Sequence, residues 1–213
     1  MFSLAGMIIL VAGLWYWTSS QNDDDTILQT PLVQPITEVP VTYEYKDTTL
    51  GFKITFPLAF SSTSNDSLYR IDETYTYTAI GPGKSISGVK FTIPKAMTAK
   101  TNLSADSYLS VEHLPSDQSC DAIAFLGDST TESKSIREGT FSYLFASSSE
   151  AAAGNRYEEH VYALADSDPC IAVRYFIHYT AIENYLEGTV IEFDKVALLK
   201  NFDRIRKTLE LSK

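Results

Sequence analysis

Four ionisable side chains in the second half of the sequence have types and spacing that could support chemistry. Glu158 and His160 alternate along one predicted strand, and Arg174 and His178 alternate along the next. Side chains at every second position of a strand point to the same face. If the two strands pair across the turn at Asp166–Pro169, all four side chains can share a face and form a polar cluster. Histidine beside a carboxylate suits proton transfer or ligand binding.

The same pattern also fits a solvated sheet face with cross-strand charge pairs, and both interpretations stay open. Metal binding by the two histidines and Glu158 is a further alternative, although this spacing is specific to no metal. Gly81-Pro82-Gly83-Lys84 predicts a turn, because it lacks the strand–loop–helix context of a phosphate-binding loop. The sequence has no nucleophile-elbow or zinc-protease motif. We therefore predict no catalytic residue, no metal site and no cofactor.

The chain contains two cysteines, Cys120 and Cys170. No Cys-x-x-Cys motif and no histidine at ligand spacing accompanies them, which disfavours a metal site. In an oxidising compartment they are expected to form a structural disulfide, with free or catalytic thiols as the alternatives. Closing a loop of about 50 residues would stabilise the fold by roughly 4 kcal/mol.

The N-terminal segment Phe2–Trp17 contains no charged residue. A helix over Phe2–Ser20 would be roughly 28 Å long, close to the roughly 30 Å hydrocarbon core of a bilayer. Three consecutive aromatic residues, Trp15, Tyr16 and Trp17, end it as an interfacial belt would. We predict a single transmembrane anchor over residues 1–20, with the C-terminal domain extracytoplasmic, either periplasmic or extracellular. A cleaved signal peptide and a buried core helix are the alternatives.

Residues 21–42 carry three aspartates and three prolines, Pro31, Pro35 and Pro40. This composition predicts an extended linker, although Thr26–Val33 could instead add an edge strand. Residues 43–213 are then a single domain, and a hydrophobic content of 44% supports a sizeable core. The formal net charge of −10 argues against a nucleic-acid partner, because such binding needs clustered lysine and arginine.

Most of the domain has the pattern of antiparallel strands. Phe52, Ile54 and Phe56 alternate with polar residues before Pro57. A hairpin is predicted across Gly81–Lys84. The predicted extended segments are Tyr43–Phe60, Tyr69–Ile80, Val89–Ile93, Ser135–Ser147, Arg156–Leu164 and Cys170–Tyr179.

Two segments have a helical period. Asn102–Glu112 predicts a short central helix that Asn102 or Ser104 can cap. Phe193–Leu211 predicts a longer C-terminal helix with Asp194 as N-cap. Its apolar stripe consists of Leu198, Leu199, Phe202, Ile205 and Leu209. The predicted class is α+β: an antiparallel sheet packed by the central and C-terminal helices, behind the N-terminal transmembrane helix.

The start of the domain resembles that of PsbP-like domains. The resemblance lies in Tyr45–Phe60, where an aromatic residue, Asp47, Gly51-Phe52, an alternating strand and Pro57 follow one another. The predicted helix at Asn102–Glu112 and a final helix ending at Thr208-Leu209 follow the same order. The resemblance implies an α-β-α sandwich, often exported in bacteria and an accessory subunit of a membrane complex in plants. It transfers no functional residue, and the Cys120–Cys170 pair and the long spacer depart from it.

These observations predict a membrane-anchored extracytoplasmic domain of non-enzymatic binding or accessory type. Its expected partners are the membrane, through residues 2–20, and a protein or another cell-envelope component. The alternative is an envelope enzyme, or a small-ligand or metal-binding protein, that uses a polar cluster around Glu158, His160 and His178.

Overall fold

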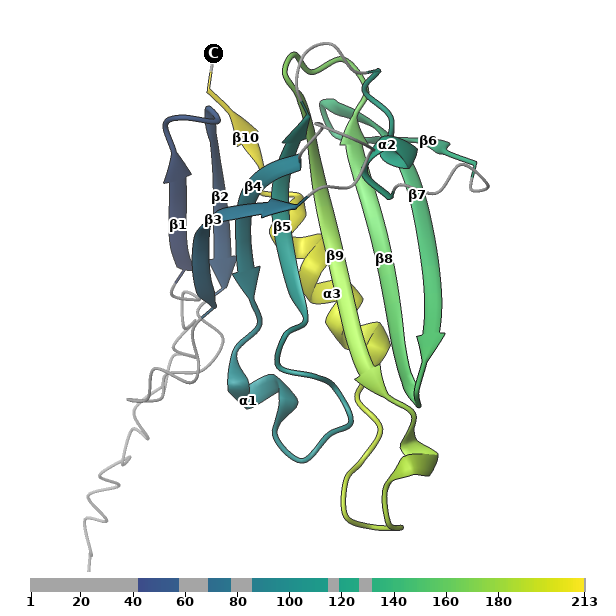
Figure 1. The fold of residues 1–213 in the computed structure, drawn as a ribbon. Coiled ribbons are helices and arrows are strands. Elements are labelled where there is room, and N and C mark those ends of the chain that lie inside the picture. Colours follow the sequence, from purple (N-terminus) through teal and green to yellow (C-terminus); the bar gives the residue numbers. More distant parts are fainter. Residues whose placement is uncertain (1–41, 58–68, 78–85, 115–118, 127–131, 213) are drawn as a thin grey trace, which may run out of the picture. The chain divides into compact units, whose positions relative to one another are not determined.

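A computed structural model describes residues 42–57, 69–77, 86–114, 119–126 and 132–212 (Figure 1). These residues belong to one compact unit, which extends from Val39 to Lys213. The described strands are β1 (Thr42–Asp47), β2 (Phe52–Pro57), β3 (Arg70–Tyr77), β4 (Ile86–Thr92), β5 (Tyr108–Leu114), β6 (Lys134–Glu138), β7 (Phe141–Ala152), β8 (Asn155–Leu164), β9 (Cys170–Thr180) and β10 (Glu210–Leu211). The described helices are α1 (Lys95–Thr98), α2 (Ala122–Leu126), the 3-10 turn η2 (Ile182–Asn184) and α3 (Lys195–Arg206).

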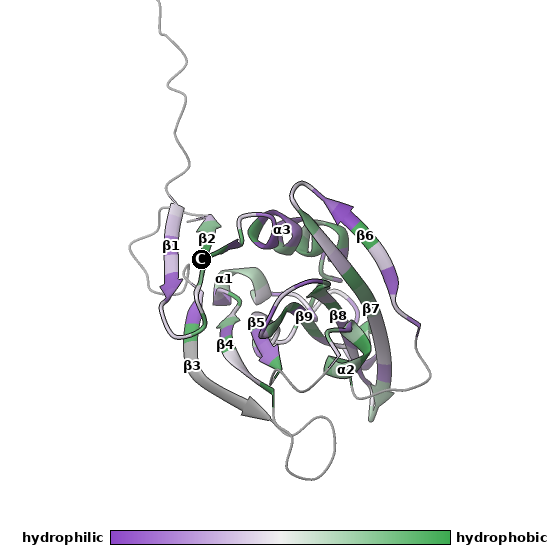
Figure 2. Ribbon diagram, turned by 90° about the horizontal axis from the view of Figure 1, so that it is seen from above, coloured by the Kyte–Doolittle hydropathy of each residue, from purple (hydrophilic) through white to green (hydrophobic). Residues whose placement is uncertain are grey.

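The strands form two antiparallel sheets. The smaller sheet has the order β1-β2-β10, and the larger has the order β3-β4-β5-β9-β8-β7-β6. Helix α3 lies on one face of the larger sheet and α2 on the other, as the view from above shows (Figure 2). The central strands β5, β9 and β8 are therefore covered on both faces, and they carry most of the buried polar residues described below.

The predicted α+β class is wrong, because the described chain is mostly β. Ten strands in two sheets replace the single sheet with two packing helices, and α3 is the one described helix longer than two turns. The reason is local: β-branched and aromatic residues fill the strands, and their side chains pack well on a pleated surface.

The predicted central helix over Asn102–Glu112 is also wrong, because Tyr108–Leu114 is the strand β5. Leu109 and Val111 belong to the main core, while Ser110 and Glu112 point to the other face and are fully buried. A strand buried on both faces loses the simple apolar–polar alternation. The apolar residues of β5 are therefore spaced by chance as they would be on one face of a helix.

The predicted C-terminal helix is present as α3. Asp194 is its N-cap, and the Asp194 carboxylate accepts a hydrogen bond from the Ala197 N–H at 2.8 Å. The helix ends at Arg206, five residues earlier than predicted. The chain then turns, buries Leu209 and adds β10 to the edge of β2.

The predicted hairpins are present, with one addition. β3 pairs with β4, and β8 pairs with β9, in antiparallel register. The segment predicted as one strand over Ser135–Ser147 is instead the hairpin β6–β7, in which Gly139 has a φ of 58° that favours glycine. β7 and β8 are joined by a tight turn at Ala153 and Gly154, both with positive φ.

Two cores lie on the two faces of the larger sheet. The main core joins the α3 face of that sheet to α3 and β2, and its central members include Phe52, Phe91, Val173 and Phe202. A smaller core lies under α2 and is built around Phe125. The α3 face thus holds the larger part of the buried apolar surface, which is the main favourable term in folding.

Among the described residues, no helix has both the length and the apolar character needed to cross a bilayer. The predicted anchor at residues 1–20 and all but the last residue of the predicted linker at 21–42 lie outside the described residues.

Candidate functional site

The register of β8 against β9 divides the predicted polar cluster between two faces. Glu158 lies opposite Ile177, and Val161 lies opposite Arg174. Glu158 and His160 therefore point to the α3 face, whereas Arg174 and His178 point to the α2 face. The sequence pattern assigned each pair to one face of its own strand. It could not supply the register between the strands, which decides whether the pairs meet.

On the α3 face, Glu158 is bound by groups from β9 and α3. The Tyr179 hydroxyl donates to the Glu158 carboxylate at 2.8 Å, and the Lys195 ammonium lies 2.5 Å from it. His160 Nε2 lies 3.9 Å from the same carboxylate. Burial acts to raise the pKa of Glu158, but the hydrogen bonds from Lys195 and Tyr179 outweigh it and lower the pKa. Burial lowers the pKa of His160, and Glu158 opposes this only in part.

This α3-face cluster is a fixed ion pair with a neutral histidine beside it. The Glu158 carboxylate is held charged by two donors, so it is a weak proton acceptor near neutral pH. Lys195 is not among the predicted site residues because it stands off the apolar stripe of α3, at the first position of the helix. Its side chain nonetheless reaches across to β8.

Further along the same face, Arg206 is buried among three tyrosines. Its guanidinium lies 4.0 Å from the Tyr162 ring centroid and 4.9 Å from that of Tyr143. Arg206 Nε donates to the Tyr175 hydroxyl at 2.7 Å, and that hydroxyl donates to Asp203 at 2.9 Å. These contacts fasten the C-terminal end of α3 to the sheet.

On the α2 face, Arg174 lies between two carboxylates, the buried Glu112 and the half-buried Glu159. Arg174 Nε lies 2.9 and 3.1 Å from the two carboxylate oxygens of Glu112, and Arg174 Nη1 donates to Glu159. The Ser110 hydroxyl donates to Glu112 at 2.6 Å. Burial raises the pKa of Glu112 to about 8 and that of Glu159 to about 7. A further donation, from Arg174 Nη2 to the Phe125 carbonyl at 2.7 Å, ties α2 to this cluster.

Close packing of β4 on β5 accompanies this buried cluster. Gly88 is the β4 residue opposite Glu112. A Cβ atom at Gly88 would lie 2.3 Å from the Val111 carbonyl oxygen, so a larger residue there would push the strands apart.

His178 lies on the α2 face near the end of β9. Its Nδ1 is 2.8 Å from the Asp106 carboxylate, and its Nε2 is 3.2 Å from Asn155 Oδ1. The imidazole stacks on the Tyr157 ring at a centroid distance of 4.5 Å. Both ring nitrogens thus have protein partners, in an environment separate from that of Glu158 and His160.

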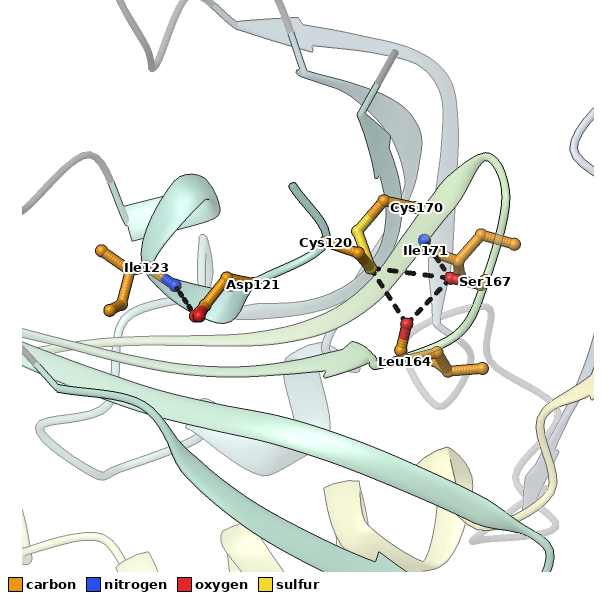
Figure 3. The surroundings of a disulfide bond; sticks show 7 residues. All are labelled: Cys120, Asp121, Ile123, Leu164, Ser167, Cys170 and Ile171. Atoms are coloured by element: carbon orange, nitrogen blue, oxygen red, sulfur yellow. Dashed lines mark hydrogen bonds between the residues drawn. A yellow bond between two sulfur atoms is a disulfide. The ribbon is translucent and has the colours of Figure 1, made fainter. Parts of the chain in front are cut away.

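The predicted disulfide between Cys120 and Cys170 is confirmed, and Figure 3 shows its surroundings. It joins the segment before α2 to the first residue of β9. Ser167 braces the adjacent turn: its hydroxyl donates to the Leu164 carbonyl at 3.0 Å and accepts from the Ile171 N–H at 2.9 Å. The bridge therefore holds α2 over the end of the β8–β9 hairpin.

Two clefts lie near the turn between β6 and β7, one beside the Arg206 cluster and the other beside the turn that Ser167 braces. One has a volume of about 170 Å³ and is lined by residues that include Phe141, Asp166 and Ser167. The other has a volume of about 420 Å³ and is lined by Glu138, Gly139, Phe141, Tyr143 and Lys207. Neither is lined by a member of the predicted polar cluster. The described residues contain no group of three or more His, Cys, Asp or Glu side chains placed to hold a metal ion.

Comparisons with known proteins give little similarity. No family model matches the sequence, and no curated protein matches it. A crystal structure from Bacteroides thetaiotaomicron VPI-5482 is similar at 14% sequence identity and a TM-score of 0.41, covering 80% of this chain and 48% of that chain. The chain thus spans about half the length of that protein.

Proposed function

We propose that this chain is a membrane-anchored extracytoplasmic domain that binds a protein partner and catalyses no reaction of its own. The observation that carries the proposal is the disulfide between Cys120 and Cys170. Structural disulfides form and persist in oxidising compartments, such as the periplasm or the extracellular space. The apolar segment Phe2–Trp17 supports a membrane tether for a domain exported in this way.

The engagement of the polar side chains supports a binding role. Glu158 binds Lys195 and Tyr179, and Arg174 joins Glu112 to Glu159. These paired charged side chains hold strands and helices together, and a buried charged side chain needs its partner to offset the cost of burial. The envelope enzyme considered as the alternative needs Glu158, His160 and His178 in one place, and the register of β8 and β9 does not bring His178 to the other two.

The resemblance of Tyr45–Phe60 to the start of PsbP-like domains also supports an accessory role. Bacterial members of that family are often exported proteins of unknown role, and plant members are accessory subunits of a membrane complex. We propose the same general type of role for this chain, with the partner recognised by the folded domain rather than by the anchor.

The experiment expresses the full chain in membranes and labels its thiols before and after reduction. The proposal expects the chain in the membrane fraction, no labelling of Cys120 or Cys170 before reduction and labelling of both afterwards. In vivo crosslinking and affinity capture should recover one partner protein. The same partner should be captured when residues 1–20 are replaced by a cleavable signal peptide that releases the domain. Free thiols in the intact cell, or no crosslinked partner, would contradict the proposal.

A further inference from the structure

Exposed apolar side chains concentrate in one segment of the described structure. Among its six exposed large hydrophobic residues, four lie between positions 185 and 196. Leu186 is 81% exposed, Val196 is 77% exposed and Ile191 is 67% exposed, with Tyr185 beside them. Single exposed apolar residues are ordinary, but a run of them on one segment marks an interaction site. This segment consists of the loop at residues 181–192, called the 181–192 loop below, and the start of α3.

The 181–192 loop projects beyond the ends of β8 and β9 in Figure 1. Its backbone is fixed by hydrogen bonds close to the apolar residues. The N–H and the hydroxyl of Thr189 both donate to the Leu186 carbonyl, at 3.0 and 2.6 Å. Asn184 Nδ2 donates to the carbonyl of Gly154, in the β7–β8 turn, at 3.0 Å. The loop therefore displays Leu186 on an ordered backbone, which lowers the entropic cost of binding.

Both ends of the loop are held by one buried side chain. Asn102 Nδ2 donates to the Thr180 carbonyl at 2.8 Å, and Asn102 Oδ1 accepts from the Phe193 N–H at 2.9 Å. The Asn102 N–H also donates to the Ile191 carbonyl at 3.1 Å. These contacts anchor the loop to the segment between α1 and β5.

The charges of the 181–192 loop and of Asp194 have one sign, and Lys195, the first residue of α3, is paired with Glu158. Residues 181–194 contain four acidic residues and no lysine or arginine; the acidic residues are Glu183, Glu187, Glu192 and Asp194, all exposed. An acidic rim around apolar side chains disfavours an anionic lipid surface and a second copy of the same segment, because like charges would meet. It favours a surface on which lysine or arginine borders an apolar pocket.

We propose that the 181–192 loop, with Val196, is the docking surface of this domain for a protein that presents an apolar pocket bordered by basic residues. Leu186 enters the pocket, and Glu183 and Glu187 face its basic border. Tyr185 supplies an aromatic contact of the kind that is enriched in binding hot spots. This inference rests on the proposed binding function and names the surface that performs it.

The test places the photocrosslinking amino acid p-benzoylphenylalanine at position 186 of the full chain in its native membrane. The matched control places it at position 71, where Ile71 is an exposed apolar residue of β3. The proposal expects a protein adduct from position 186 and none from position 71. The captured protein, once purified, should bind the full-length wild-type chain at least about tenfold more tightly than Leu186→Asp. Glu187→Lys should weaken binding, and a lysine-to-glutamate change at the crosslinked border of the partner should restore it.

The outcomes distinguish this inference from the proposed function. A partner that binds Leu186→Asp as tightly as wild type overturns the docking surface and leaves the binding function in place. Adducts from position 186 only to lipid, or only to a second copy of the chain, overturn the docking surface as well. Failure of any partner to bind the wild-type chain overturns both. Leu186→Asp should melt as wild type does, because Leu186 is 81% exposed.

Discussion

Arg174 and Glu112 form a buried ion pair at the centre of the seven-stranded sheet, with Arg174 Nε at 2.9 and 3.1 Å from the two carboxylate oxygens. Arg174 is 2% exposed and Glu112 is fully buried. The same guanidinium also donates to Glu159 and to the Phe125 carbonyl. One cation therefore has two carboxylate neighbours, which makes the cluster sensitive to pH and dependent on Arg174.

Stability should fall as the pH rises toward 8. Burial raises the pKa of Glu112 to about 8 and that of Glu159 to about 7, from an ordinary value of 4.5. Between pH 4.5 and about pH 8 the folded state therefore binds more protons than the unfolded state. The free energy of unfolding decreases as the pH rises through this range. Because the two carboxylates share Arg174, they should titrate as a pair. Urea unfolding at pH 5, 6.5 and 8 measures the effect.

Glu159→Gln should flatten this pH dependence. It removes one of the two ionisations, and at pH 8 its free energy of unfolding should exceed that of wild type by about 1–2 kcal/mol. At pH 5, close to the unfolded-state pKa of 4.5, the difference between the two proteins should be much smaller than at pH 8. Glu183→Gln, an exposed carboxylate in the 181–192 loop, is the control and should keep the wild-type slope. Equal slopes for wild type and Glu159→Gln would contradict the assignment.

Replacing Arg174 should destabilise the fold strongly. Arg174→Met leaves the buried Glu112 carboxyl and the Phe125 carbonyl without their shared donor, which should cost about 3–5 kcal/mol in urea unfolding at pH 7. Adding Glu112→Gln should recover part of the loss, because an amide that cannot ionise replaces the buried carboxyl that has lost its partner. Arg204→Met, at an exposed position of α3, should change stability by less than about 0.5 kcal/mol. A loss in Arg174→Met no larger than in Arg204→Met would show that the ion pair is not structural.

The sequence predicted the local elements better than their assembly. The strand containing Phe52, Ile54 and Phe56, the β8–β9 hairpin and the N-cap Asp194 are all present, because alternation and capping are properties of a few neighbouring residues. The β5 strand was not predictable from its own residues. Its buried Glu112 makes sense only with Arg174, which lies 62 positions away along the chain.

The candidate site shows the same division. Which face each polar residue occupies within its strand follows from alternation, but the meeting of Glu158 with Lys195 and of Arg174 with Glu112 depends on register and helix docking. Asn102 is an instructive case. As an amide before a helix-like pattern it predicted an N-cap, yet it clamps the two ends of the 181–192 loop.

Breaking the disulfide should weaken the domain. The Cys120→Ala/Cys170→Ala variant loses a bridge across 50 residues, and the chain-entropy model gives a cost of roughly 4 kcal/mol. Differential scanning calorimetry with and without dithiothreitol measures it. The melting temperature of reduced wild type should lie close to that of the double variant. The reductant should not change the melting temperature of the double variant. A wild-type melting temperature that does not respond to complete reduction would contradict this prediction.

The pKa of His160 should report on the ion pair beside it. Burial lowers this pKa below the ordinary value of 6.5, Glu158 raises it in part and Lys195 lowers it. Lys195→Met should therefore shift the titration of His160 to higher pH, and Glu158→Gln should shift it to lower pH. Two-dimensional NMR of the imidazole protons follows both shifts. Lys200→Met, at an exposed position one turn further along α3, is the control and should leave the titration in place.

Asn102→Ala should release the 181–192 loop without unfolding the sheet. The substitution removes the hydrogen bonds to the Thr180 carbonyl and from the Phe193 N–H, and Asn102 is only 3% exposed, so the two backbone groups lose a buried partner. We expect a loss of about 2 kcal/mol in stability. Amide hydrogen exchange should become faster across residues 181–193 while β5 and β9 stay protected.

Asn184→Ala is the matched control for this prediction, because it removes a single hydrogen bond from an exposed side chain. It should change exchange less than Asn102→Ala does, and mainly near the Gly154 turn. If the loop is the docking surface, Asn102→Ala should also weaken partner binding although it leaves Leu186 in place, since a released loop must be ordered again on binding. Unchanged exchange across residues 181–193 would mean that the ends of the loop are fixed by their backbone hydrogen bonds and not by the Asn102 side chain.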